Sequence, residues 1–259
     1  MHAWLCENPI GIDAVTWQEL PTPVPAEGQV LINIKAASLN FPDILIVQNK
    51  YQHKPALPFV PGSEYAGVIE AVGPGVTHLK VGQNVACLSG TGGFGTHTLA
   101  PAAMCMPLPN GFSHVDAAAF IMIYATSYHA LVDRAQLKAG ETVLILGAAG
   151  GVGTSAIQIA KAMGARVIAA ASSDEKCALC KSIGADETIN YSTQDLRESI
   201  KTPSPPSAAS PGAAVIWWSV LLRGRFPHCR STSCYSKAHR SWAYSGAISP
   251  KKSPKPTPP

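Results

Sequence analysis

Acidic residues are missing from the last part of this 259-residue sequence. Residues 201–259 hold nine Lys and Arg but no Asp or Glu, whereas residues 1–200 hold 11 Lys and Arg and 16 Asp and Glu. The net charge of +4 therefore divides into −5 for the first 200 residues and +9 for the rest. Ten Pro and eleven Ser also fall in that last part. The composition thus predicts a change in the character of the chain near Lys201.

The sequence also lacks long apolar runs and a basic leader. The run at 213–222 is interrupted by Ser219 and is well short of the roughly 20 residues that a membrane-spanning helix needs. The first residues have neither the basic nor the apolar region of a signal peptide. The seven Cys are scattered and odd in number, which suits a reducing compartment. We expect a cytoplasmic protein with no membrane association and, because its basic tail contains no recognisable binding module, no specific nucleic-acid partner.

The first part of the chain is predicted to be rich in β-strands. Apolar and polar residues alternate in Val30–Ala37, and Tyr65–Gly73 and Val85–Leu88 have a similar pattern. Turns rich in Pro and Gly separate these segments. Many short strands in series favour a compact barrel, and the pattern becomes helical from Val115.

A glycine-rich turn follows the apolar segment Thr142–Leu146 and precedes a predicted helix, Thr154–Met163, and a second apolar segment, Arg166–Ala171. Such a turn lets the backbone approach a dinucleotide diphosphate, and the helix N-terminus offers free N–H groups and a partial positive charge. The predicted cofactor-binding residues of the turn are Ala148, Gly150, Gly151, Val152 and Gly153.

The end of the second predicted strand favours NADP over NAD. NAD sites place an acidic residue there to bind the ribose 2′-hydroxyl, but this chain has no acid before Asp174. Ser172 leaves room for a 2′-phosphate, Lys176 could supply a positive charge, and Tyr191 is a further donor. The alternative is that Lys176 is an ordinary solvated residue in the first turn of the next helix.

Four motifs resemble the medium-chain dehydrogenase/reductase superfamily and, within it, the zinc-free quinone oxidoreductases of the zeta-crystallin type. They lie at residues 37–43, 61–73, 125–131 and 147–153. The resemblance implies an α/β plus β fold: a GroES-like β-barrel substrate domain at 1–122, then a Rossmann NADP-binding domain at 123–201. It extends to about residue 200.

The residues that would hold a catalytic zinc ion are not present. The resemblance places Asn40 where zinc-dependent relatives have Cys, and Ser63 where they have His. Because catalytic zinc needs about three protein ligands, Glu64 alone cannot hold the ion. We predict no metal, and we interpret Glu64 as a buried, hydrogen-bonded structural carboxylate.

The predicted reaction is hydride transfer from NADPH to a quinone or an activated alkene, with neutral donors stabilising the charge that develops on the acceptor oxygen. By resemblance, Asn40 and Tyr51 line the substrate cleft and Thr126 lies near the nicotinamide. Structural alternatives remain open: Asn40 could fix its own turn, Tyr51 could cap the barrel, and Thr126 could cap a helix.

The resemblance ends near residue 202. We expect residues 202–259 to be a disordered, aberrant reading of the gene, such as a frameshift. The Rossmann domain would then be incomplete, the strand at Thr142 would have an unpaired edge, and the family homodimer contact would be lost. Two alternative functions stay open: an enoyl-thioester reductase and an inactive NADP-binding fragment.

Overall fold

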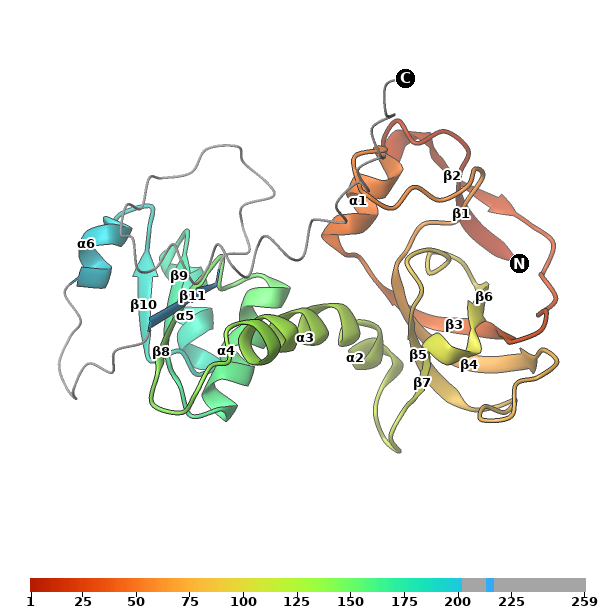
Figure 1. The fold of residues 1–259 in the computed structure, drawn as a ribbon. Helices are drawn as coiled ribbons and strands as arrows, with labels where there is room; N and C mark the ends of the chain where they lie inside the picture. The colour runs from red at the N-terminus through yellow and green to blue at the C-terminus, as the bar shows by residue number, and fades with distance from the viewer. Residues whose placement is uncertain (202–212, 217–259) are drawn as a thin grey trace, which may run out of the picture. The chain divides into compact units, whose positions relative to one another are not determined.

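The computed structural model describes residues 1–201 and 213–216 and divides the chain into two compact units (Figure 1). The first unit is Met1–Ala125, and the second begins at Thr126. No helix in the described residues is both long enough and apolar enough to span a bilayer.

The first unit is built from antiparallel strands. Five form a sheet in the order β6-β3-β4-β5-β7, and two form a separate hairpin-like pair, β1-β2. The strands are β1 (His2–Cys6), β2 (Val15–Glu19), β3 (Gln29–Ser38), β4 (Glu64–Val72), β5 (Asn84–Leu88), β6 (His97–Pro101) and β7 (Cys105–Pro107). The helical segments are η1 (Ile12–Ala14), α1 (Phe41–Val47), η2 (Ala102–Met104), α2 (His114–Ala118) and α3 (Ile121–Tyr128), which continues into the second unit.

The long strand β3 sets the shape of this unit. It pairs with β4 along most of its length, and two register irregularities bend it. Val30 and Ile32 alternate inward and pack with Tyr65, Ile69 and Val85 in one buried cluster. The predicted strands of this unit are confirmed.

The second unit is a parallel sheet in the order β10-β9-β8-β11, with helices between successive strands (Figure 1). Its strands are β8 (Thr142–Leu146), β9 (Arg166–Ala171), β10 (Glu187–Asn190) and β11 (Ala213–Ile216). Its helices are the π-helical η3 (His129–Arg134), α4 (Gly151–Ala162), α5 (Asp174–Ser182) and α6 (Leu196–Lys201). This order matches the start of the Rossmann arrangement, strands 3-2-1-4.

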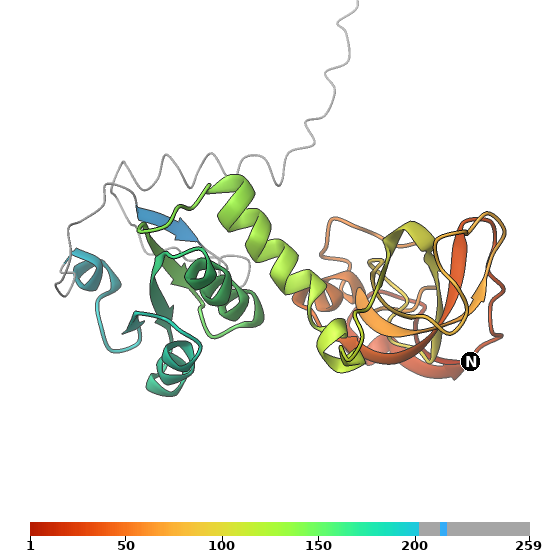
Figure 2. The ribbon, with the colours of Figure 1, turned by 90° about the horizontal axis from the view of Figure 1, so that it is seen from below.

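Both faces of this sheet are buried by apolar side chains. The sequences of its strands are therefore continuous apolar runs and do not alternate apolar and polar residues. Side chains such as Val143 and Val167 pack on one face against α4 and α5, which lie beside the strands in Figure 2. Leu144 and Ile168 belong to a second cluster on the opposite face, where Leu196 of α6 also packs.

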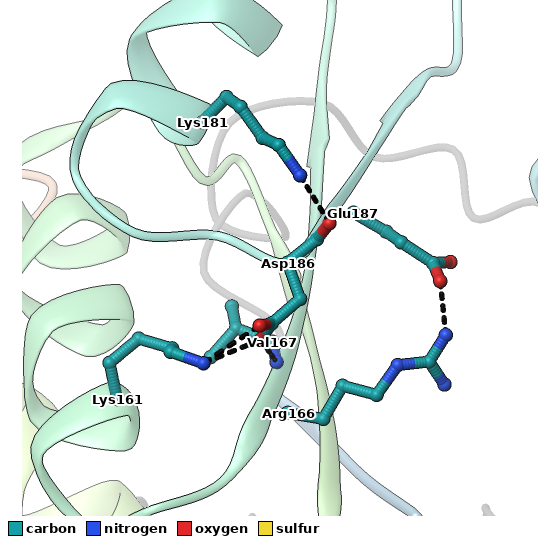
Figure 3. A network of polar contacts seen from close by, with 6 residues as sticks. All are labelled: Lys161, Arg166, Val167, Lys181, Asp186 and Glu187. Carbon is teal, nitrogen blue, oxygen red and sulfur yellow. Dashed lines mark hydrogen bonds and ion pairs between the residues drawn. The ribbon is translucent and has the colours of Figure 1, made fainter. Parts of the chain in front are cut away.

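A polar network joins the ends of the helices to the start of the sheet (Figure 3). The Asp186 carboxylate accepts from Lys161 Nζ at 2.8 and 2.9 Å and from the Val167 amide at 2.7 Å. Lys181 Nζ donates to the Asp186 carbonyl. The four residues tie α4, β9 and α5 to the segment that leads into β10.

The structure corrects two predictions about this unit. The strand at Thr142 does not have an unpaired edge, because β11 pairs with β8 in parallel, with Ala213 opposite Thr142. Four residues from the segment predicted to be disordered therefore take the place of a fourth Rossmann strand. The rest of that segment, 202–212 and 217–259, lies outside the described residues, and so does the frameshift prediction.

The second correction concerns the helix predicted to begin at Thr154. Helix α4 begins at Gly151, with Gly150 as its N-cap. Glycine has a low helix propensity, so the pattern placed the start after the glycines, but tertiary packing against β8 overrides that preference.

Candidate active site

The glycine-rich turn between β8 and α4 is shaped by close backbone packing. Gly147 has a φ of 63°, a left-handed conformation that glycine adopts without strain. A Cβ atom on Gly153 would lie 2.6 Å from Ala148 Cα, Ala148 O and Gly147 O. Only glycine therefore lets α4 pack this closely on the turn.

The backbone N–H groups of two predicted cofactor-binding residues donate hydrogen bonds to other backbone atoms of the protein. The Ala148 N–H donates to Ala170 O of β9 at 3.1 Å, and the Gly150 N–H donates to Gly147 O at 3.0 Å. Ala148 is also fully buried, whereas Gly150 is exposed. These two residues shape the turn, and their N–H groups are not available to a ligand.

The other three predicted residues form the first turn of α4. The Thr154 N–H donates to Gly150 O at 2.8 Å and closes the first hydrogen-bonded turn. The amides before it, of Gly151, Val152 and Gly153, have no intrahelical partner, as at every helix start. Together with the positive end of the helix dipole, they form a site that suits an anion.

The residues predicted to select NADP converge at the carboxyl end of β9. Lys176 Nζ donates to Ser172 Oγ at 3.2 Å, so the ammonium group lies where the strand ends. The nearest acid, Asp174, accepts a hydrogen bond from Asn190 Nδ2 at 2.7 Å. Tyr191, 43% exposed, directly follows the neighbouring strand β10. A cation and a hydroxyl thus occupy the position that NAD sites give to an acid.

A buried carboxylate lies at the start of β4 in the first unit. Glu64 is fully buried and accepts from Ser38 Oγ at 2.8 Å, Asn40 Nδ2 at 3.1 Å and the Met122 amide at 2.9 Å. The three donors are neutral, and the last belongs to the first turn of α3. The interpretation of Glu64 as a buried, hydrogen-bonded structural carboxylate is confirmed.

The Asn40 amide is turned toward this carboxylate. Its Nδ2 group donates one hydrogen bond to Ser38 Oγ, at 2.8 Å, and one to the Glu64 carboxylate. Its backbone N–H donates to Asp43 Oδ2 at 2.8 Å, as an N-cap residue of α1. Burial raises the pKa of the Asp43 carboxyl, although hydrogen bonds from Ser63 and Asn40 oppose the shift. Asn40 therefore fixes its own turn, while a ligand-binding role for it stays a prediction.

A cavity of about 170 Å³ lies beside this network. Tyr51 and Ser63 line it, and Ser63 Oγ donates to Asp43 Oδ1 at 2.5 Å. His53, which the sequence analysis did not single out, also lines it, and Asn40 does not. The only indication in the sequence that His53 lines this cavity is its position two residues after Tyr51. The lining residues are Pro42, Ile46, Tyr51, His53, Ser63, Leu88, Gly90 and Met122.

Thr126 lies inside α3, so it is not a helix N-cap. Its neighbour Ser127 is the buried residue and donates from Oγ to Val152 O at 2.9 Å. Ser127 Oγ also lies 2.7 Å from Ser155 Oγ. Sequence reasoning missed Ser127, because only the helical phase of α3 shows which of the two hydroxyls faces α4.

The donors around Glu64 do not fit a catalytic zinc ion. Glu64 is already hydrogen-bonded to neutral donors, and Asn40 and Ser63 offer neither the thiolate nor the imidazole that zinc prefers. Within the described residues, no three His, Cys, Asp or Glu side chains converge on a common point.

A GroES-like β unit followed by a Rossmann sheet with a glycine-rich turn is the arrangement typical of dehydrogenases and reductases that use a nicotinamide coenzyme. The sequence matches the alcohol dehydrogenase GroES-like domain over residues 26–110 and the zinc-binding dehydrogenase family over 151–206. The chain belongs to the medium-chain dehydrogenase/reductase family.

Individual relatives point to the quinone oxidoreductases of this family. The rat quinone oxidoreductase is 39% identical over 199 residues, covering 76% of this chain and 59% of that protein. The crystal structure of the quinone oxidoreductase from Thermus thermophilus, also solved with NADPH, has a TM-score of 0.67 and 37% identity and covers 78% of this chain and 62% of that one.

A third relative is a much longer protein. The phthioceranic/hydroxyphthioceranic acid synthase of Mycobacterium tuberculosis is 37% identical over 181 residues, which are 68% of this chain and 8% of the synthase. The chain spans about six-tenths of the length of the quinone oxidoreductases that it matches.

Proposed function

We propose that this chain binds NADPH through the β8–α4 turn and the end of β9, and reduces a small quinone or activated alkene without a metal ion. The observation that carries the proposal is the pairing of two features. Three helix-start amides suit a diphosphate, and Lys176 of α5, with Ser172 just after the adjacent strand β9, suits a 2′-phosphate.

The residues of the second unit fit this coenzyme. Gly150 is exposed, and a Cβ atom on it would have only Gly147 O within 4 Å, at 3.4 Å, so the outer side of the turn is open. The amides of Gly151, Val152 and Gly153 would hold the diphosphate, and Lys176 the 2′-phosphate. Reduced NADPH, when bound, supplies a hydride.

The cavity in the first unit supports a small, uncharged acceptor. Its volume of about 170 Å³ is below the roughly 300–1,000 Å³ of drug-sized ligand sites. The hydroxyl of Tyr51 and the ring of His53 are the donors that could bind an acceptor oxygen and stabilise the negative charge that develops there. Ser63 already donates its proton to Asp43, so it would act only as an acceptor.

The coenzyme part is tested by titrating the full chain with NADPH and NADH. We expect Lys176→Ala to weaken NADPH binding about tenfold or more and leave NADH binding unchanged, because a charged hydrogen bond is worth about 1.5–3 kcal/mol. The matched control is Lys138→Ala, another exposed lysine of the second unit. Equal loss for both coenzymes, or no loss, would contradict the assignment of Lys176.

The reaction is tested by following NADPH oxidation with small benzoquinones and with enoyl thioesters. The similarity to a segment of an acid synthase keeps the enoyl-thioester reductase as the second candidate. Turnover of quinones alone supports the first proposal, and turnover of thioesters alone supports the second. NADPH binding without turnover of either would identify the chain as an inactive coenzyme-binding fragment.

A further inference from the structure

The anion-binding amides of α4 belong to peptide groups whose carbonyls are themselves hydrogen-bonded. The amide of each residue is conjugated with the carbonyl of the residue before it. The Gly151, Val152 and Gly153 amides therefore share peptide groups with the carbonyls of residues 150, 151 and 152. A donor on one of these carbonyls polarises the group and strengthens the N–H on its other side.

Each of the three carbonyls has such a donor. Gly150 O accepts from the Thr154 amide at 2.8 Å, and Gly151 O accepts from Thr154 Oγ1 at 2.9 Å. Val152 O accepts from Ser127 Oγ at 2.9 Å and from Ser155 Oγ at 3.0 Å. Of the donors just named, Ser127 comes from another helix, α3.

The two serines differ from surface hydroxyls because both are almost fully buried, at 1% exposure each. Their hydroxyl oxygens are 2.7 Å apart, so one donates to the other. The second hydrogen can then be donated to Val152 O, which lies within hydrogen-bond distance of both hydroxyls. Burying two hydroxyls is costly unless they are hydrogen-bonded, and this arrangement satisfies them on the peptide group that carries the Gly153 amide.

We propose that Ser127 and Ser155 are positioning residues for the coenzyme: through Val152 O they orient and polarise the Gly153 amide that binds the diphosphate. The inference rests on the proposed function. Cooperative strengthening of about 10–30% per hydrogen bond is small, but the target is a charged ligand held by only three amides. We therefore expect a measurable loss of affinity that is confined to ligands with the diphosphate.

The test compares wild type with Ser127→Ala, Ser155→Ala and the double variant. Three ligands are titrated: NADPH, 2′-phospho-ADP-ribose and 2′-AMP, which has the 2′-phosphate but no diphosphate. We expect the double variant to bind the first two about 2–4-fold more weakly and to bind 2′-AMP as wild type does, because only the first two contact the polarised amides. Ser182→Ala is the control for removing a helical serine hydroxyl away from the turn, because the exposed Ser182 donates from Oγ to Leu179 O at 2.8 Å in α5.

The possible results distinguish a failure of the proposed role of the two serines from a failure of the proposed coenzyme binding. If wild type does not bind NADPH, the proposed function itself is contradicted. If wild type binds and the double variant binds equally well, the inference is overturned while the function stands. Equal weakening of all three ligands also overturns it, since that result means a general loss of structure. Binding of 2′-AMP shows that each variant is folded.

Discussion

Replacing Gly153 by Ala tests the packing of the turn directly. The added Cβ would lie 2.6 Å from three backbone atoms of Gly147 and Ala148, well inside ordinary van der Waals contact. None of these atoms belongs to a flexible side chain, so α4 must move. Overpacking of this kind costs about 1–3 kcal/mol, and three backbone contacts favour the upper end.

The packing clash and the helix propensity predict opposite signs for the change in the free energy of unfolding. Ala is a better helix residue than Gly by about 0.8–1 kcal/mol, so without the clash Gly153→Ala would stabilise the protein. The two effects together leave a loss of about 2 kcal/mol in the free energy of unfolding, or roughly 4–8 °C in Tm. Because the displacement also moves the three N-terminal amides of α4, NADPH binding should weaken.

Thermal melts followed by circular dichroism, with and without NADPH, measure both effects. Gly150→Ala is the matched control three residues earlier, because its Cβ would have only one neighbour within 4 Å, at 3.4 Å, an ordinary contact. Its Tm should stay within a few degrees of wild type. A Gly153→Ala variant that melts at or above the wild-type temperature would refute the argument.

Three further predictions concern other parts of the molecule. Glu64→Gln should cost about 1–3 kcal/mol of unfolding free energy, seen in urea melts, because an amide nitrogen would face donors that need an acceptor. Burial raises the pKa of Asp186, but hydrogen bonds and charge from Lys161 outweigh it and lower the pKa below its ordinary value. Its stabilisation is therefore complete above the unfolded pKa of about 3.9 and lost as the pH falls through the lowered pKa, so Asp186→Asn should lose stability at neutral pH and converge with wild type in acid melts. Treatment with EDTA should leave Tm and NADPH binding unchanged, because the donors around Glu64 do not suit a zinc ion. A lower Tm or weaker NADPH binding after EDTA would show that the protein holds a metal ion elsewhere.

The local motifs of this protein could be predicted because their causes are local. The run Thr142–Leu146 is apolar and is followed at once by glycines, so a buried strand and a tight turn follow from a few neighbouring residues. Position alone also brings Ser172 and Lys176 together, since they are four residues apart across a strand end and a helix start.

The remaining features depend on which distant segments meet. Nothing near Ala213 in the sequence shows that it pairs with β8, because the partner of a parallel strand is chosen by the whole sheet. The sequence drew attention to Thr126, but successive helix residues point about 100° apart, and α3 turns Ser127 toward Val152. The sequence by itself determined the fold class and the glycine-rich turn; only tertiary packing decided which hydroxyl binds the first turn of α4 and which strand completes the described sheet.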